Sequence, residues 1–124
     1  MFFRKHRGHR FVDRGDPAAA DFNKDTLTFG MQYIDLDLSG ILPKSARLVM
    51  LRLKVEISAG APACIVRSKD NTHSANKDVL QPYVLDTCYY KNLWVACGSD
   101  GIIQCLFMIA TYTICDLTVG GWFE

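Results

Sequence analysis

Residues 46–57 carry the clearest alternation of apolar and polar positions in the chain. The apolar side chains stand at every second position: Val49, Leu51, Leu53, Val55 and Ile57. Charged side chains stand between them: Arg52, Lys54 and Glu56. A period of two is typical of a strand with one buried face, whereas a helix would spread these charges around its surface. The pattern therefore predicts a long central strand of an antiparallel sheet, with its odd-numbered side chains in the core.

Shorter alternating or extended segments, separated by turn residues, predict the remaining strands. They cover residues 26–29, 32–38, 63–67, 79–85, 93–97, 102–108 and 111–119. In the last of these we expect Thr113, Cys115, Leu117 and Val119 to face the core. Residues 86–92 are predicted to form a turn with two exposed tyrosines. About eight strands without a helical segment predict an all-β fold, an antiparallel two-sheet sandwich of the jelly-roll type.

Residues 1–22 differ from this pattern and predict an extended basic N-terminal arm before a β-sandwich domain of residues 23–124. Residues 1–14 hold five basic residues against one acidic residue, a net charge of +4, and the other residues hold nine against twelve, −3. A disordered tail normally lacks aromatic anchors, so we expect the arm to dock on a protein surface. The alternative is a mobile, solubilising arm. The predicted docking residues are Phe2, Phe3, Arg4, Lys5, Arg7, Arg10 and Phe11.

The sequence offers no specific catalytic or metal-binding pattern, although its composition of 49% hydrophobic and 22% charged residues is that of a globular protein. His73 is the only histidine in the predicted β domain. Asp35 and Asp37 share a strand face, but no third acid accompanies them, so a solvated outer face is predicted. Arg14-Gly15-Asp16 precedes Pro17 and predicts a turn. We therefore expect a protein that is not an enzyme and has no cofactor and no metal.

Two further partner classes are not expected from the sequence. The longest apolar run, around residues 106–110, is far shorter than the ~20 residues that span a bilayer, so no membrane partner is predicted. Residues 1–21 lack the apolar stretch of a secretion signal. The basic arm could neutralise phosphates, but nothing supplies a groove-reading helix or a stacking sheet, so a protein partner is expected in place of nucleic acid.

The cysteines and the outer strand faces indicate self-association. Five cysteines are an odd number, so at least one is free or paired between chains. Cys105 and Cys115 fall on inward faces as apolar fillers, whereas Cys88 lies in a predicted turn and is the candidate for an intermolecular disulfide. Apolar residues on nominal outer faces predict an oligomer interface. They are Leu48, Met50, Leu106, Tyr112 and Ile114.

Four segments of the chain resemble a known protein family. They are residues 12–22 (VDRGDPAAADF), 35–43 (DLDLSGILP), 46–52 (ARLVMLR) and 116–123 (DLTVGGWF). This pattern is similar to that of small single-domain β-sandwich proteins encoded in phage and environmental viral genomes. The likeness covers most of the chain from Val12 onward, and its motifs are structural. The basic extension before Val12 and the five cysteines depart from the family pattern.

The resemblance implies a virion structural protein, assembled in the host cytoplasm. Its expected place is as a capsid decoration protein, a neck or collar subunit, or a tail fibre subunit. The expected partners are copies of itself, with a trimer as one candidate, and another virion protein such as the major capsid or a neck protein. The alternative function is a glycan-binding module that presents loop residues to a sugar. The candidate glycan contacts are His73, Tyr89 and Tyr90.

Overall fold

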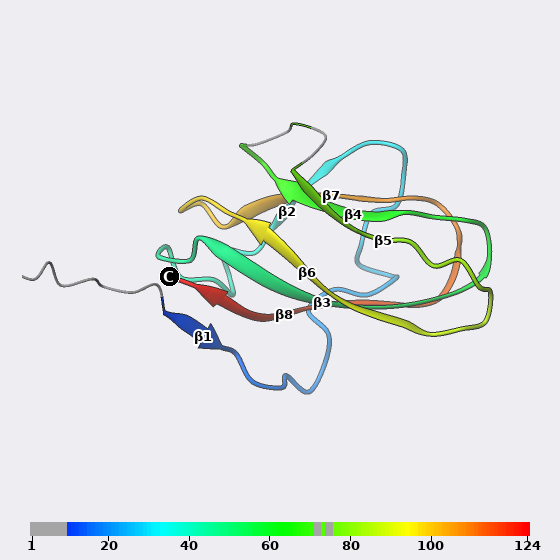
Figure 1. Cartoon of the computed structure of the whole chain (residues 1–124), viewed down its shortest axis with the longest axis horizontal. Coiled ribbons are helices and arrows are strands. Elements are labelled where there is room, and N and C mark those ends of the chain that lie inside the picture. Colours follow the sequence, from blue (N-terminus) through cyan, green and yellow to red (C-terminus); the bar gives the residue numbers. More distant parts are fainter. Residues whose placement is uncertain (1–9, 71–72, 74–75) are drawn as a thin grey trace, which may run out of the picture.

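The computed structural model describes residues 10–70, 73 and 76–124, and this part of the chain forms eight strands without a helix (Figure 1). In chain order the strands are β1 (Phe11–Asp13), β2 (Ile34–Asp37), β3 (Leu48–Ala59), β4 (Cys64–Ser68), β5 (Lys77–Leu80), β6 (Tyr89–Ala96), β7 (Ile102–Phe107) and β8 (Thr111–Phe123). The two long strands, β3 and β8, lie side by side along the length of the molecule.

The strands form two four-stranded antiparallel sheets, with the orders β1-β8-β3-β6 and β2-β7-β4-β5. The pairs β4/β5, β3/β6, β2/β7 and β1/β8 are nested around the β4–β5 connection, as in one long hairpin. Successive pairs of this hairpin belong alternately to the two sheets. A hairpin rolled in this way is a jelly roll. The prediction of an all-β, jelly-roll-like sandwich of eight strands is confirmed.

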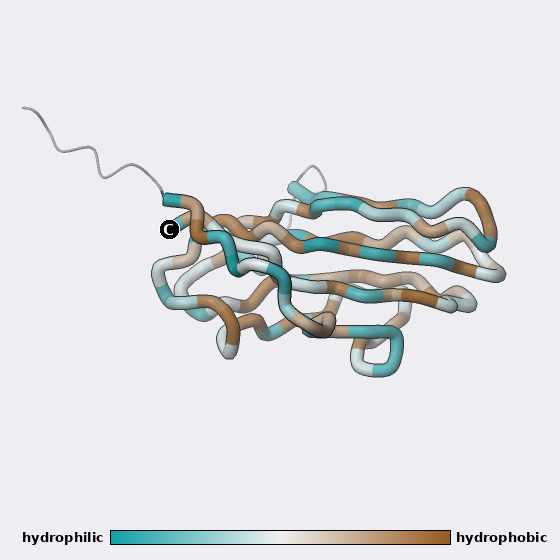
Figure 2. Tube along the Cα trace, turned by 90° about the horizontal axis from the view of Figure 1, so that it is seen from below, coloured by the Kyte–Doolittle hydropathy of each residue, from teal (hydrophilic) through white to brown (hydrophobic). Residues whose placement is uncertain are grey.

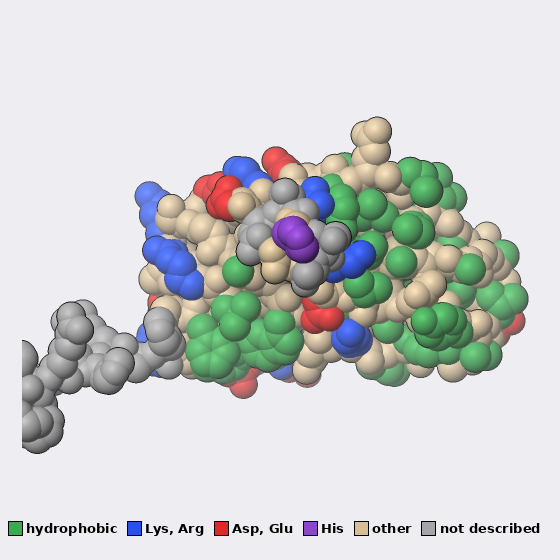
Figure 3. All heavy atoms as spheres, turned by 45° about the horizontal axis from the view of Figure 1, so that its top comes forward, with side chains coloured by type: hydrophobic (Ala, Val, Ile, Leu, Met, Phe, Trp, Pro, Cys, Tyr) green, Lys and Arg blue, Asp and Glu red, His purple; other side chains and the backbone are tan. Residues whose placement is uncertain are grey.

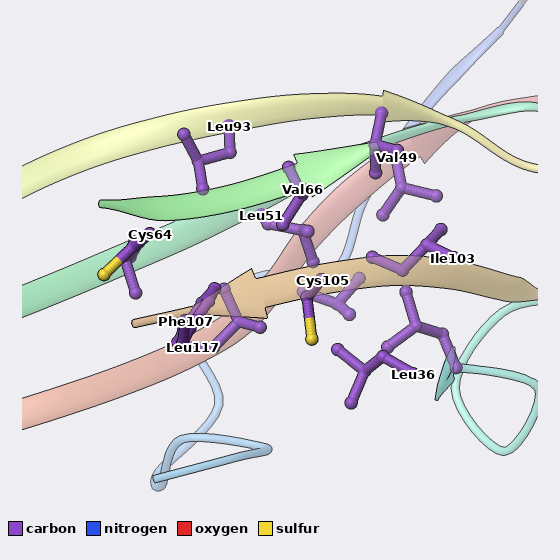
Figure 4. Close-up of a cluster of buried hydrophobic side chains, with 14 of the residues drawn as sticks. Leu36, Val49, Leu51, Cys64, Val66, Leu93, Ile103, Cys105, Phe107 and Leu117 are labelled. Carbon is purple, nitrogen blue, oxygen red and sulfur yellow. The ribbon is translucent and has the colours of Figure 1, made fainter. Parts of the chain in front are cut away.

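The core lies between the two sheets and receives the inward side chains of both (Figure 4). Phe107 is its largest fully buried side chain, at 1% exposure. The predicted inward face of the central strand is confirmed, because all five of its odd-numbered apolar residues are at most 1% exposed. Figure 2 shows the resulting alternation as brown and teal bands along the strands. No charged or polar side chain of the described residues is buried in this core.

Three register shifts in the β3–β8 pairing change which residues face the core. Two of them lie between Glu56 and Ala59, so Tyr112 pairs with Ile57 on the core side of the sheet. The Tyr112 hydroxyl donates a hydrogen bond to the carbonyl oxygen of Met108 at 2.6 Å. The prediction that Tyr112 points outward, and that Thr113 points into the core, is therefore wrong. A β-bulge, which strict alternation cannot anticipate, reverses the facing of both residues.

Other strand boundaries also differ from the predicted ones. Residues 26–29 do not form a strand, because Asn23 closes a turn by accepting hydrogen bonds from Thr26 and Leu27, and only Phe29 makes a single bridge. The predicted turn at 86–92 overlaps β6, which begins at Tyr89, whereas β5 ends at Leu80. In the predicted arm, β1 pairs with the end of β8. Residues 11–13 are therefore part of the sandwich.

Asp78 connects the two sheets at the edge where β5 meets β6. Its carboxylate accepts hydrogen bonds from the Trp94 backbone N–H at 3.0 Å and from the Lys91 ammonium at 3.1 Å. It also accepts the N–H of Val79. Partial burial raises the pKa of Asp78, but these hydrogen bonds outweigh it and hold the pKa below its ordinary value of 3.8.

We predict that this carboxylate stabilises the fold above its unfolded-state pKa and that the contribution disappears as the pH falls through its lower folded-state pKa. Asp78→Asn should therefore lower the free energy of unfolding at pH 7 by about 1 kcal/mol, since the ion pair is partly exposed. Chemical denaturation of both proteins between pH 7 and pH 2 measures the difference. If the difference in free energy of unfolding between the two proteins stays constant down to pH 2, the charge of Asp78 does not contribute to stability.

Candidate functional site

Aromatic rings gather on the outer face of the β1-β8-β3-β6 sheet, at the end where the described chain begins. The Phe11 ring lies 5.0 Å from that of Phe123 and 6.3 Å from that of Trp94, between ring centroids, and Trp94 lies 6.1 Å from Phe123. Leu48 and Met50 lie between them on β3, opposite Phe123 and Trp94. We call these five residues the aromatic patch. Figure 3 shows a group of hydrophobic side chains in this region.

The aromatic patch is partly open to solvent. Trp94 is 41% exposed and Phe11 is 36% exposed. Gly121 lies under the Phe11 ring, which occupies the space that a Cβ atom would need. An exposed cluster of large apolar side chains on a sheet face is typical of a protein-binding surface.

Only two of the predicted arm-docking residues lie within the described part of the chain. Phe11 belongs to the aromatic patch, so this anchor lies on the protein's own sandwich. Arg10 donates a hydrogen bond from its guanidinium to the Glu124 carboxylate at 2.7 Å. Phe2, Phe3, Arg4, Lys5 and Arg7 lie outside the described residues. The arm's docking role therefore stays a prediction.

The predicted oligomer-interface residues do not form one exposed band. Met50 and Leu106 are each only 8% exposed, so neighbours in the same chain already cover them. Ile114 lies half-buried opposite Glu56, several residues along β3 from the aromatic patch. Leu48 and Met50 contribute to the aromatic patch, and Leu106 lies on the other sheet.

The structure does not bring the three predicted glycan contacts together. Tyr89 and Tyr90 point to opposite faces of β6, and Tyr89 packs against the core with its hydroxyl accepting the N–H of Val84 at 3.0 Å. His73 lies in the β4–β5 connection, whose Lys69 forms an ion pair with Asp100 beyond the far end of β6. Because β6 rises ~3.3 Å per residue, Tyr90 is roughly 20 Å from that end. The ring of Tyr90 is exposed and lines a groove.

That groove lies on the outer face of the β1-β8-β3-β6 sheet and has a volume of about 220 Å³. Its floor is a grid of outward side chains from three neighbouring strands. One row is Tyr90, Lys54 and Asp116, and the next row is Asn92, Arg52 and Thr118. The Lys54 ammonium lies 5.6 Å from the centroid of the Tyr90 ring. The groove therefore offers an aromatic ring beside hydrogen-bond donors and acceptors.

The loop after β1 forms the wall of the groove through Asp16, Pro17, Ala19 and Ala20. Gly15 starts this loop with a φ of 86°, a conformation that favours glycine. Its carbonyl oxygen accepts a hydrogen bond from the Arg52 guanidinium at 3.0 Å. At the two ends of the loop, Arg14 and Asp21 form an ion pair. The wall is thus fastened to the sheet that it borders.

Four of the five cysteines are buried, and all five are free thiols. Cys105 and Cys115 are both fully buried, as predicted. Desolvation by burial raises the pKa of Cys64 and of Cys105 to about 11, and raises the pKa of Cys97 and of Cys115 as well. These four thiols are therefore protonated, and poor nucleophiles, at neutral pH. Cys88 is half-buried outside the strands, and its intermolecular disulfide stays a prediction.

Comparisons with known proteins assign no family to the chain. No protein-family model matches it, and a search of curated proteins gives no match. The resemblance to viral β-sandwich proteins therefore stays a prediction. Within residues 10–70, 73 and 76–124, no three His, Cys, Asp or Glu residues form a group that could hold a metal ion. The same residues contain no helix that is long and apolar enough to cross a bilayer.

Sequence reasoning missed Trp94 of the aromatic patch and the polar grid of the groove. The outward direction of Trp94 could have been found from alternation, because Leu93 and Val95 are inward and Trp94 lies between them. Alternation also predicts that Arg52 and Lys54 point outward, but it does not show that they lie beside Tyr90. That connection needs the register of β3 and β6, which one strand's own pattern does not contain.

Proposed function

We propose that the protein is a virion structural subunit that associates with copies of itself through the aromatic patch. The observation that carries this proposal is the cluster of Phe11, Trp94 and Phe123 on one sheet face, in which Phe11 and Trp94 are exposed. A buried Trp contributes ~150–250 Å² of contact, and Trp is among the residues that dominate binding energy in interfaces. A second copy of this chain is the natural occupant, because the same patch on both partners gives a self-complementary contact.

Two further features support a role in a viral shell. Capsid proteins are among the proteins that use the jelly roll, although lectins use it too and the fold alone decides no function. The basic residues before β1 lie next to the aromatic patch in sequence, where they can bind an acidic neighbour such as the major capsid protein. Together these features support a structural role in a virion.

Trp94→Ser tests the proposal, since this exposed ring can be removed without opening the core. We expect the wild-type protein to be an oligomer in light scattering at micromolar concentration, and Trp94→Ser to dissociate at least about tenfold more readily. Tyr83→Ser is the matched control, because Tyr83 is 78% exposed and lies outside the aromatic patch. It should leave the oligomer unchanged. A wild-type protein that stays monomeric, or an oligomer that Trp94→Ser does not weaken, would overturn self-association through the aromatic patch.

A further inference from the structure

We infer that the groove on the outer sheet face binds a saccharide, with one sugar ring on Tyr90 and its hydroxyl groups held by the polar side chains of the groove floor. The sequence predicted glycan contacts in loops, whereas this site lies on the outer face of the sheet. This site does not depend on self-association through the aromatic patch, because Tyr90 lies four residues along β6 from Trp94, about 13 Å away.

The Tyr90 ring supplies the apolar contact. It is 71% exposed, so its ring is open to a ligand. The C–H groups on one face of a pyranose ring pack against an aromatic face through weak C–H···π contacts. Lys54 approaches this ring only at 5.6 Å, and its flexible side chain can turn toward Asp116 on the neighbouring strand.

The polar groups of the floor suit hydroxyl groups, which both donate and accept hydrogen bonds. Asp116 accepts, Lys54 donates, and the Asn92 amide does both. Within the described part of the chain, none of these three side chains forms a hydrogen bond or an ion pair with another residue. They are therefore available to a ligand without breaking a hydrogen bond or an ion pair of the folded protein.

The groove carries both positive and negative side chains, and this mixture favours a neutral sugar over other classes of ligand. The lining holds three cations, Arg52, Lys54 and Lys91, but Arg52 already bonds to the Gly15 carbonyl oxygen and Lys91 already pairs with Asp78. A phosphate or another polyanion would also face the carboxylates of Asp16 and Asp116, and a wholly apolar ligand would desolvate charged groups without replacing their hydrogen bonds. A neutral, hydroxyl-rich ring meets neither penalty. The volume of about 220 Å³ is below the range of sites for drug-sized ligands, so the groove has room for about one ring of a longer saccharide.

The groove is also built to keep its shape. Its floor belongs to three strands that hydrogen-bond to each other, and its wall is held by Arg52 and by the Arg14–Asp21 ion pair. A site that is already ordered loses little conformational entropy when a ligand binds.

A glycan array with the full-length protein tests this inference. The probes are neutral hexasaccharides of glucose, mannose, xylose and N-acetylglucosamine, together with uronate-containing and sulfated oligosaccharides. We expect binding to at least one neutral hexasaccharide. Calorimetry with that probe should show affinity reduced about tenfold or more by Tyr90→Ala and by Asn92→Ala. Tyr83→Ala removes a similarly exposed tyrosine outside the groove and should change the affinity less than about twofold.

The outcomes divide clearly. If Tyr90→Ala and Asn92→Ala leave the melting temperature unchanged, their loss of saccharide affinity comes from the groove and not from unfolding. Absence of binding to every neutral probe would overturn the inference, as would binding that both variants retain. Binding confined to sulfated or uronate probes would also overturn it, since that result shows capture of anions by Arg52 and Lys54.

Discussion

Asp21→Ala is expected to lower the free energy of unfolding by about 3 kcal/mol, because it breaks several contacts of one partly buried group. The Asp21 carboxylate forms a bidentate ion pair with the Arg14 guanidinium, and one of its two hydrogen bonds is 2.9 Å long. It also accepts the backbone N–H of Val119 at 2.8 Å. The side chain of Asp21 is only 11% exposed and that of Arg14 is 24% exposed, so alanine would leave a partly desolvated cation and an unpaired N–H.

Asp21→Asn is the matched control for this variant. Its amide oxygen can still accept the N–H of Val119 but cannot pair with both guanidinium nitrogens, so the loss should be about half as large. Urea denaturation of the three proteins measures the difference. An Asp21→Ala protein within about 0.5 kcal/mol of the wild type would show that this ion pair does not fasten the loop. If the groove binds a saccharide, the same substitution should weaken binding, because it loosens the wall.

The alternation of side chains was enough to predict the fold class and the inward face of β3. Burial imposes a period of two on any strand with one solvent face, so Val49 to Ile57 could be placed from sequence alone. The same reasoning failed where the backbone departs from regular pairing. Tyr112 faces the core because β8 bulges opposite the end of β3, and nothing in its own segment marks that bulge.

The candidate sites were less predictable than the fold, since both combine residues distant in sequence. The aromatic patch joins Phe11 of β1 to Phe123 of β8, and their contact follows from the pairing of the first strand with the last. The groove joins Asp16, Lys54 and Tyr90 in the same way. Long-range pairing of this kind depends on topology, which residue periodicity does not specify.

The jelly roll also explains why both sites lie on one sheet face. Nested pairing places β3 and β8 at the centre of the β1-β8-β3-β6 sheet, so their outward residues form a long continuous surface. Apolar residues occupy this surface next to β1, and charged residues occupy it beyond Met50. A second copy seated on Trp94 would therefore leave the Tyr90 end of the groove open.

Gly121→Ala is expected to release β1 from the sheet and to lower the free energy of unfolding by about 2 kcal/mol through overpacking. A Cβ atom on Gly121 would lie 2.5 Å from the carbonyl oxygen of Val12 and inside contact distance of the Phe11 ring. The carbonyl oxygen is backbone and cannot turn aside. Either β1 moves away or β8 shifts, and β1 is the weaker partner because it pairs through only three residues.

Gly120→Ala separates this effect from a general intolerance of β8 to side chains. The atoms nearest to its Cβ would be in the outer parts of the Met50 and Arg52 side chains, which can move, so the loss should stay below about 1 kcal/mol. Limited trypsin digestion detects the release of β1 directly. Cleavage after Arg14 should be faster in Gly121→Ala than in Gly120→Ala, because Arg14 donates its N–H to Gly120 only while β1 is docked. The aromatic patch loses Phe11 in the same step, so Gly121→Ala should also weaken self-association. Equal cleavage rates and equal stabilities for the two variants would mean that β1 is not held against Gly121, and that Phe11 contributes little to the aromatic patch.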